Sequence, residues 1–232
     1  MQALGGSDED ESRRVRSKKE LEIILEKVGH FGRPKIRYEQ YRLPANVAAE
    51  VLWYIATRHG DIQGKVIADF GCGTGMLSLG AALMGAAYVI GIDIDLPPLL
   101  EARTSAREVS VSNRVDFVNA EVGRLHMEVD VVIQNPPFGV RVREADRAFL
   151  KNGIKSAPKV YSIHKGGKKA REFVSSFVKG CGGHVDEVLP LKIKLTPTYH
   201  FHKKKAHTFE ADLFRIVRDQ DGKYPEEGRL PR

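Results

Sequence analysis

Cysteine is scarce in this sequence, with only Cys72 and Cys181 among 232 residues. Two cysteines are too few for a disulfide framework or for a metal site built from four thiolates, so a reducing compartment is expected. Long apolar runs are also missing, and none approaches the roughly 20 residues that cross a bilayer. The first residues, "MQALGGSDEDESRR", have no apolar core and give no sign of a secretory or mitochondrial address. These absences predict a soluble, cytoplasmic protein.

Positive charge, by contrast, is in surplus. The chain has 37 Lys and Arg residues against 30 Asp and Glu residues, which gives a net charge of +7 and a pI near 9.4. Each cation that neutralises a phosphate releases a counterion and adds affinity, so this surplus favours a polyanionic partner, although charge alone is weak support for one. The length is that of one α/β domain with extensions.

The chain divides into four predicted segments. Residues 1–12 are acidic, residues 219–232 are polar, and both lack apolar periodicity, so both are predicted to be disordered. Residues 13–60 are predicted to form a helical extension, with one amphipathic helix around residues 21–28 and a second helix that ends at Gly60. Residues 61–218 are predicted to form the main domain.

Strands and helices alternate in the main domain. The apolar runs in "KVIADFG", "YVIGIDID", "RVDFVNAEV", "VDVVIQ" and "KVYSIHK" are continuous, which is typical of strands buried on both faces of a parallel sheet. Helices are predicted at "MLSLGAALMGA", "PPLLEARTSAREVS" and "KKAREFVSSFVKG". Two further strands, "HVDEVLPLKIKL" and "TFEADLFRIVR", follow. The order predicts a doubly wound, mostly parallel α/β sheet with a final antiparallel strand.

A glycine-rich turn, "ADFGCGTGM", joins the first strand of this sheet to its first helix. Gly71, Gly73 and Gly75 would let the backbone approach a ligand closely, and the helix start offers unpaired N–H groups. The dinucleotide fingerprint G-x-G-x-x-G needs a glycine where Met76 stands, so the spacing favours S-adenosylmethionine over NAD. A tight turn without a ligand is the alternative.

Acidic residues follow the next two strands. Asp93 is placed to accept hydrogen bonds from ribose hydroxyls, and Asp95 is a competing candidate that points the same way. Glu121 follows the third strand, where a carboxylate could accept a proton from an adenine amino group. Each acid could instead cap a helix or lie in a solvated turn. Their position at successive strand ends favours an adenosine-containing ligand.

The fourth strand ends in Asn135, Pro136, Pro137 and Phe138. In a doubly wound sheet this strand lies beside the first, across the crevice where ligands bind. The prolines fix φ and remove amide donors, which leaves the Asn135 side-chain oxygen and the Pro136 carbonyl as rigid acceptors for one planar NH₂ group. Two fixed acceptors would favour a pyramidal nitrogen whose lone pair points at a sulfonium methyl, with Phe138 as a stacking face. The alternative is a proline-stiffened strand exit with Phe138 in the core.

Two basic clusters, "GVRVREADR" and "YHFHKKKAH", are predicted near the carboxyl edge of the sheet, where they could hold RNA phosphates. The alternative is a solvated run of charge. The histidines of the second cluster have neither a cysteine nor a carboxylate beside them, so no metal site is predicted. The predicted RNA-binding residues are Arg141, Arg143, Arg147, Lys203, Lys204 and Lys205.

Together these motifs resemble the amino-methylating class I methyltransferases. More narrowly, "YEQYRLPANVAAEVL", "GIDID", "NPPFG", "ADRAFL", "VYSIHK" and "YHFHKKK" resemble the archaeal and eukaryotic small-subunit ribosomal RNA N6-adenosine methyltransferases, over residues 20–218. The resemblance implies a Rossmann-like class I fold, S-adenosylmethionine as cofactor and N6-methyladenosine in RNA as product. It also implies a small zinc-binding activator subunit, which works with the eukaryotic members.

The resemblance further assigns cofactor contacts, and it brings the helical extension into the cofactor site. Relatives commonly carry Thr in place of Leu43 and Asp in place of Glu121, so those two contacts are expected to differ here. The implied cofactor-binding residues are Gln40 and Leu43 at the methionine portion, Gly71, Gly73, Thr74, Gly75 and Met76 at the centre, Asp93 at the ribose, and Glu121 and Val122 at the adenine.

Two other functions stay open. A glutamine carboxamide has the same planar nitrogen, so methylation of protein glutamine at N5 is a second enzymatic hypothesis. Those enzymes more often carry Tyr in place of Phe138 and have no need of basic loops. A catalytically idle RNA-binding or assembly subunit is the third, against which the intact glycines, Asp93 and Asn135 argue.

Overall fold

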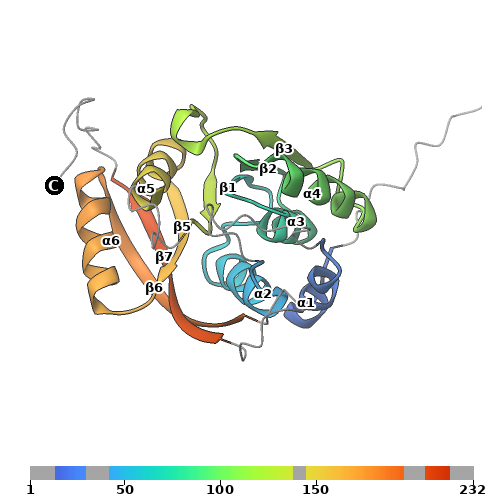
Figure 1. The fold of residues 1–232 in the computed structure, drawn as a ribbon, viewed down its shortest axis with the longest axis horizontal. Coiled ribbons are helices and arrows are strands. Elements are labelled where there is room, and N and C mark those ends of the chain that lie inside the picture. The colour runs from blue at the N-terminus through green and yellow to red at the C-terminus, as the bar shows by residue number, and fades with distance from the viewer. Residues whose placement is uncertain (1–13, 30–41, 138–144, 196–206, 220–232) are drawn as a thin grey trace, which may run out of the picture.

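The centre of the molecule is a seven-stranded sheet in the order β3-β2-β1-β4-β5-β7-β6 (Figure 1). The computed structural model describes residues 14–29, 42–137, 145–195 and 207–219. Neighbouring strands from β3 to β5 pair in parallel, and β7 runs antiparallel to both β5 and β6. The prediction of a doubly wound sheet with a final antiparallel strand is confirmed. The strands are β1 (Val66–Phe70), β2 (Tyr88–Asp93), β3 (Val115–Asn119), β4 (Val131–Gln134), β5 (Lys159–Lys165), β6 (Gly183–Leu195) and β7 (His207–Arg218).

Helices cover both faces of the sheet. One face packs against α1 (Lys18–Glu26), α2 (Ala45–Tyr54), α3 (Met76–Leu83) and α4 (Leu96–Glu108) around one apolar core. The other packs against α5 (Ala145–Ser156) and α6 (Lys168–Gly180) around a second core, which also takes in the short helix η3 (Val122–Arg124). Among the described residues, none of these helices combines the length and apolar character that spanning a membrane requires.

The helical extension is fastened to the main domain. The Ser17 side chain caps α1 by accepting a hydrogen bond from the Glu20 N–H at 3.1 Å. Leu21 and Leu25 of α1 are fully buried in the first core. Arg42 Nη2 donates to the Leu25 carbonyl at 2.9 Å and to the Val28 carbonyl at 2.8 Å, which ties the start of the next segment to the end of α1.

The second predicted helix ends where expected. After α2 the chain continues as a π-helical turn, η2 (Ile55–His59), and Gly60 then adopts a φ of 67° that stops the helix. One helix was not predicted: α5 supplies the crossover that two parallel neighbours, β4 and β5, require. The predicted disordered segments at 1–12 and 219–232 lie outside the described residues, apart from Asp219, whose N–H donates to the Gly182 carbonyl at 3.0 Å.

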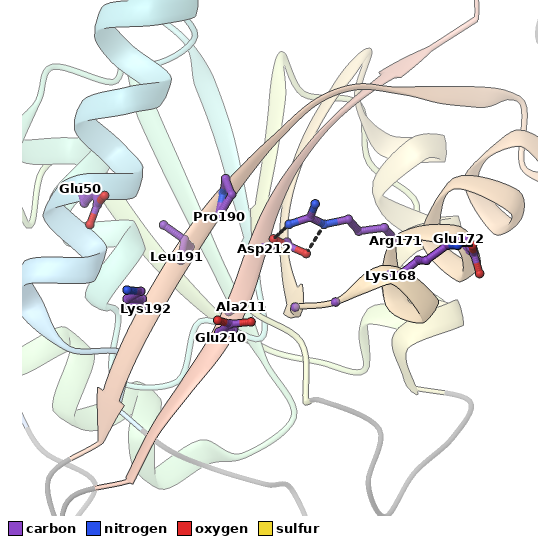
Figure 2. Close-up of a pocket in the computed structure, with 12 residues that line it drawn as sticks. Glu50, Lys168, Arg171, Glu172, Pro190, Leu191, Lys192, Glu210, Ala211 and Asp212 are labelled. Atoms are coloured by element: carbon purple, nitrogen blue, oxygen red, sulfur yellow. Dashed lines mark hydrogen bonds and ion pairs between the residues drawn. The ribbon is translucent and has the colours of Figure 1, made fainter.

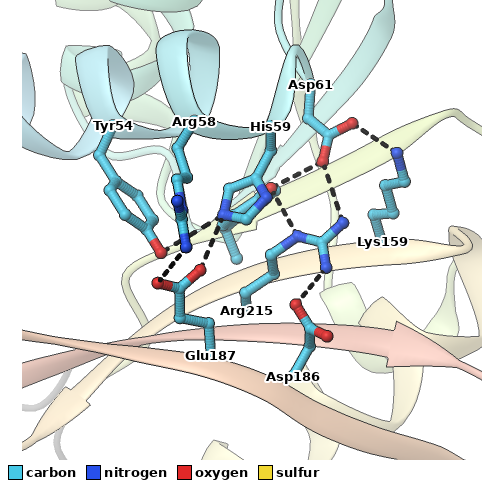
Figure 3. A network of polar contacts seen from close by, with 9 residues as sticks. Tyr54, Arg58, His59, Asp61, Lys159, Asp186, Glu187 and Arg215 are labelled. Atoms are coloured by element: carbon cyan, nitrogen blue, oxygen red, sulfur yellow. Dashed lines mark hydrogen bonds and ion pairs between the residues drawn. The ribbon is translucent and has the colours of Figure 1, made fainter.

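A buried polar network ties β5 and β7 to the segment before β1 (Figure 3). Asp61 is 1% exposed and accepts hydrogen bonds from Lys159 Nζ at 2.6 Å and from the Tyr161 hydroxyl at 2.7 Å. Arg215 lies 3.6 Å from the same carboxylate and also pairs with Asp186. Because Asp61 balances two cations and one hydroxyl, its loss would leave all three without their shared acceptor.

We therefore expect Asp61→Ala to lower the free energy of unfolding by about 3 to 5 kcal/mol, measured by urea denaturation. Lys19→Ala is the matched control, because Lys19 forms an exposed ion pair with Glu22 at 3.2 Å. That control should cost less than about 0.5 kcal/mol. Equal losses from the two substitutions would contradict the role given to the buried carboxylate.

Candidate active site

The glycine turn is held against the end of β2. Gly71, Gly73 and Gly75 have φ values of 70°, 54° and 81°, a region that residues with a Cβ rarely adopt. The N–H groups of Gly71 and Cys72 donate to the Ile92 carbonyl at 2.8 and 3.0 Å. The turn therefore takes its position from backbone hydrogen bonds to the neighbouring strand, and its glycines present bare main chain to a ligand.

Asp93 lies against this turn. Its Oδ2 accepts a hydrogen bond from the Gly73 N–H at 2.9 Å, and its Oδ1 accepts one from the Asp95 N–H at 2.9 Å. Burial raises the pKa of Asp93, while these two backbone hydrogen bonds act in the opposite direction. Asp95 is 5% exposed and precedes the first residue of α4. Of the two candidates for the ribose, Asp93 is the one bonded to the glycine turn.

The predicted adenine subsite lies at the end of β3. Glu121 is exposed, and one of its carboxylate oxygens lies 2.9 Å from Arg124 Nε. An adenine amino group would have to compete with that arginine, so the Glu121 contact stays a prediction. The Val122 carbonyl accepts a hydrogen bond from Asn152 Nδ2 at 2.7 Å. Asn152 belongs to α5, and the sequence analysis did not single it out.

Asn135 ends up beside the glycine turn. Phe70 and Gln134 are partners in the parallel register of β1 and β4, so the residues that follow them, Gly71 and Asn135, leave neighbouring strands at the same edge. Pro136 is buried, and Asn135 is half-buried. The sequence prediction that the fourth strand lies beside the first is confirmed. Phe138 lies outside the described residues.

A buried polar chain supports the strand that carries Asn135. Gln134 Nε2 donates to Ser162 Oγ at 3.0 Å, and Ser162 Oγ lies 2.6 Å from His164 Nε2. Burial lowers the pKa of His164 to about 4, so the imidazole is neutral near pH 7. One of its ring nitrogens can therefore accept a hydrogen bond from the Ser162 hydroxyl. These hydrogen bonds link β4 to β5 at the residue that precedes Asn135, and no sequence motif indicates them.

Helix α5 also touches the glycine turn. A Cβ built on Gly71 would lie 3.0 Å from the ring of Phe149, closer than ordinary packing allows. Phe149 therefore fills the space that a side chain at position 71 would occupy. With Asn152 at the Val122 carbonyl, α5 contacts two of the four predicted cofactor subsites, the centre and the adenine subsite.

Other predicted cofactor contacts are buried. Leu43, Thr74 and Met76 are 4%, 2% and 4% exposed, so they offer little surface to a cofactor, and their contacts stay predictions. Among the described residues, no group of three His, Cys, Asp or Glu side chains could hold a metal ion. The predicted site residues that lie outside the described part are Gln40, Phe138, Arg141, Arg143, Lys203, Lys204 and Lys205.

A concavity of about 700 Å³ lies between the start of α6 and strands β6 and β7 (Figure 2). Arg171 and the buried Asp212 line it and form a two-pronged ion pair with N–O distances of 2.8 and 2.7 Å. The remaining charged residues of its lining carry both signs. None of the predicted site residues that the structure describes lines this concavity, so it is separate from the glycine turn.

Just before the glycine turn, Asp69 is 1% exposed and accepts a hydrogen bond from Ser78 Oγ at 2.6 Å. This bond ties the end of β1 to α3. Burial raises the pKa of Asp69 to about 7, although the Ser78 hydrogen bond favours the ionised form.

Comparison with known proteins identifies similar chains. The sequence profile of the ribosomal protein L11 methyltransferase family matches residues 54–136, the part that contains the glycine turn and ends at Pro136. The rRNA N(6)-adenosine-methyltransferase METTL5 of Danio rerio is 36% identical over 205 residues, 86% of this chain and 98% of the relative. The corresponding protein of Drosophila melanogaster is 34% identical over 85% of this chain and 95% of its own length.

A solved structure agrees with these relatives. The crystal structure of a candidate RNA methyltransferase from Pyrococcus horikoshii superimposes with a TM-score of 0.80 and is 38% identical. The superposition covers 88% of this chain and 99% of that one. The likeness therefore extends well beyond the glycine turn, to the strands and helices that follow β4.

The high pKa of Asp69 has a measurable consequence. The unfolded chain releases this proton near pH 3.8, whereas the folded protein keeps it until about pH 7. The folded state binds more protons across that window, so this group's contribution to the free energy of unfolding falls as the pH rises through it. Asp69→Asn cannot ionise, so its stability relative to the wild type should rise by about 2 kcal/mol between about pH 5 and about pH 7. If urea denaturation gives the same difference in free energy of unfolding between Asp69→Asn and the wild type at both pH values, the prediction is contradicted.

Proposed function

Because the chain belongs to the family of rRNA N6-adenosine methyltransferases, we propose that it methylates N6 of an adenosine in small-subunit ribosomal RNA. The observation that carries the proposal is the pairing of Phe70 with Gln134, which brings the glycine turn and the Asn135 turn to one edge of the sheet. A cofactor on the first turn and an amino group on the second would meet there. Alignment of two bound reactants is the main requirement for a methyl transfer.

The residues of the glycine turn fit S-adenosylmethionine. Three glycines with positive φ expose bare main chain, α3 begins directly after them, and Asp93 keeps lone pairs for ribose hydroxyls beside its two backbone bonds. Glu121 and the main chain of Val122 would hold the adenine. When bound, S-adenosylmethionine supplies an electrophilic methyl group on a sulfonium. This chain's residues orient the two reactants and accept hydrogen bonds.

Asn135 and Pro136 would act on the target amino group. An adenine N6 lone pair is delocalised into the ring, so the nitrogen is a poor nucleophile while it stays planar. The Asn135 side-chain oxygen and the Pro136 carbonyl would accept its two hydrogens, favour a pyramidal nitrogen and stabilise the positive charge that develops there. Gln134 and Ser162 would hold the strand in place. The proton leaves the nitrogen after the methyl group has been transferred.

Methylation of a protein, of which the glutamine hypothesis is one case, is less well supported than methylation of RNA. The L11 methyltransferase profile ends at residue 136, before the basic segments and α5. The ribosomal protein L11 methyltransferase of Klebsiella pneumoniae matches over only 75 residues, 26% of its length. These matches cover the cofactor half of the sheet and do not extend to the part that would select a substrate.

We also propose that a small zinc-binding subunit docks at the edge of the sheet formed by β3. This edge strand carries Val118, which is 40% exposed, and Leu96 and Leu100 of α4 are 49% and 52% exposed. Leu96 and Leu100 are four residues apart and so share one face of the helix. With Ile94, which is 50% exposed, they account for four of the six exposed large apolar side chains in the described part of the chain. Val118 alternates along β3 with Val115 and Phe117, which pack in the first core with α4, so it faces the other side of the sheet. Such a cluster of exposed apolar side chains, on both sides of an open sheet edge, favours a protein partner that covers the edge.

The catalytic assignment is tested with Asn135→Ala. Loss of one acceptor should lower the rate of N6-methyladenosine formation by about 100-fold or more, while S-adenosylmethionine affinity changes less than about threefold. The rate is measured by mass spectrometry of nucleosides from small-subunit ribosomal RNA, transcribed without modification and incubated with labelled cofactor. Binding is measured by calorimetry. Asn113→Ala, at an exposed residue before β3, is the control and should leave both unchanged.

Two results would overturn these assignments. A labelled nucleoside other than N6-methyladenosine, or label in protein that survives ribonuclease, would refute the adenosine assignment. An Asn135→Ala enzyme with the wild-type rate would refute the mechanism.

The docking surface is tested with Leu100→Asp. This exposed position should accept the charge without loss of folding, whereas a charge in an apolar interface should abolish co-purification of a co-expressed small zinc-binding subunit. Ile23→Asp is the control, because Ile23 is 47% exposed on α1 and lies outside the cluster. Zinc content and the stoichiometry of the purified complex are the readouts. Retention of the subunit by Leu100→Asp would contradict the proposal.

A further inference from the structure

An arginine and two phenylalanines stack between α5 and α6. The guanidinium carbon of Arg147 lies 5.8 Å from the ring centroids of both Phe173 and Phe177. The two rings are 5.9 Å apart with an interplanar angle of 23°, a stacked arrangement. Distances of this size between a guanidinium and an aromatic ring are those of a cation–π contact.

The two rings differ in burial. Phe177 is 5% exposed and belongs to the second apolar core with Val174 and Val178. Phe173 is 38% exposed and is the only aromatic residue among the exposed large apolar side chains of the described part. A single exposed apolar residue is ordinary. Here the partly exposed ring is stacked on Phe177 and lies 5.8 Å from the Arg147 guanidinium, so its position is fixed next to a positive charge.

Charge around the stack has one predominant sign. Helix α5 carries three cations and one acid, and α6 carries four cations and one acid, a net charge of +5 on two helices of a chain whose total is +7. Both helices on the face that the second core supports therefore carry a net positive charge, although one of the cations, Arg171, is paired with the buried Asp212. The cations are Arg147, Lys151, Lys155, Lys168, Lys169, Arg171 and Lys179.

The stack also lies near the proposed reaction. Helix α5 starts at the carboxyl edge after β4, and α6 starts at the same edge after β5, which pairs with β4. Arg147 is in the first turn of α5, and Phe173 is in the second turn of α6. At 1.5 Å of rise per residue, both lie within about 10 Å of that edge along their helices. Asn135 leaves β4 at this edge.

We propose that Phe173 and Arg147 form a stacking platform for an unpaired nucleotide that neighbours the target adenosine. The inference rests on the proposed RNA methylation and deepens it. Extrusion of the target base toward Asn135 leaves adjacent bases without a stacking partner. Unpaired RNA bases are commonly held on aromatic rings and guanidinium planes, with cations along the phosphates. Phe173 supplies the aromatic ring, Arg147 supplies the guanidinium, and the surrounding lysines supply cations for the phosphates.

The test compares Phe173→Leu with the wild type on a synthetic RNA hairpin that contains the adenosine mapped by mass spectrometry. Leucine keeps apolar contact with Phe177 and suits a helix but has no π-face. We expect KM for this RNA to rise about tenfold, with kcat within about twofold and an unchanged midpoint of thermal unfolding. Phe173→Trp should keep KM near the wild-type value because it restores the ring.

Abasic substitutions identify the nucleotide. Each residue flanking the adenosine is replaced in turn by an abasic unit, and hairpin affinity is measured by fluorescence anisotropy with S-adenosylhomocysteine present. At the stacked position, the abasic unit should lower the affinity of the wild type for the hairpin about tenfold. It should lower the affinity of Phe173→Leu very little, because that variant has already lost the stacking contact. If the loss of affinity from the abasic unit is as large in Phe173→Leu as in the wild type at every flanking position, the proposal is overturned.

Arg147→Ala is compared with Lys179→Ala, which removes one positive charge from the far end of α6. The arginine variant should weaken hairpin binding by at least about threefold more than the lysine variant. Equal effects would show that only net charge matters and would overturn the platform. If the wild type forms no N6-methyladenosine, the proposed function fails, while the anisotropy comparison of Phe173→Leu with Phe173→Trp still decides whether the ring binds a base.

Discussion

The candidate site depends on the parallel pairing of β1 with β4. Parallel strands end at the same edge of a sheet, so the match of Phe70 with Gln134 leaves Gly71 and Asn135 as neighbours whatever their side chains are. The pairing of β1 with β2 works in the same way, because the turn bonds to the Ile92 carbonyl and to Asp93. The main positions in the site are thus set by main-chain hydrogen bonds, which are difficult to change by substitution and leave the side chains free for chemistry.

Helix α5 adds a second level of support. Phe149 fills the space beside Gly71, and Asn152 holds the Val122 carbonyl, so one helix contacts the centre and the adenine end of the predicted cofactor site. The same helix begins directly after the segment that contains Phe138. A shift of α5 would therefore alter the cofactor site and the catalytic segment together. Between β4 and β5, the hydrogen bond from Gln134 Nε2 to Ser162 Oγ gives a partner to a buried donor that would be costly if left unpaired.

Local pattern predicted most of the sheet, because strands buried on both faces read as continuous apolar runs and the glycine turn has a recognisable spacing. Helix α5 was missed because its twelve residues include Gly153, an unfavourable residue in a helix, and few apolar positions. Asp93 and Asp95 could not be separated, since strand geometry points both the same way; in the structure β2 ends at Asp93. The contacts of Asp61 with residues 98 and 100 positions away arise only from the tertiary fold.

The order of strands separates the proposed activities in space. β3 is one edge of the sheet and β6 the other, and β4, which carries Asn135, lies in the middle. A subunit docked on β3 would contact α4 and the strand ends that carry Asp93 and Glu121, on the cofactor side of Asn135. An RNA held by α5 and α6 would lie on the opposite side of Asn135. An activator at β3 would therefore act through the loops that bind the cofactor, because the strands between it and Phe173 keep it from the nucleotide platform. Activation and RNA recognition would then lie on different sides of one sheet, linked where the glycine turn meets Asn135 and through α5, which carries Arg147 and contacts both Gly71 and Val122.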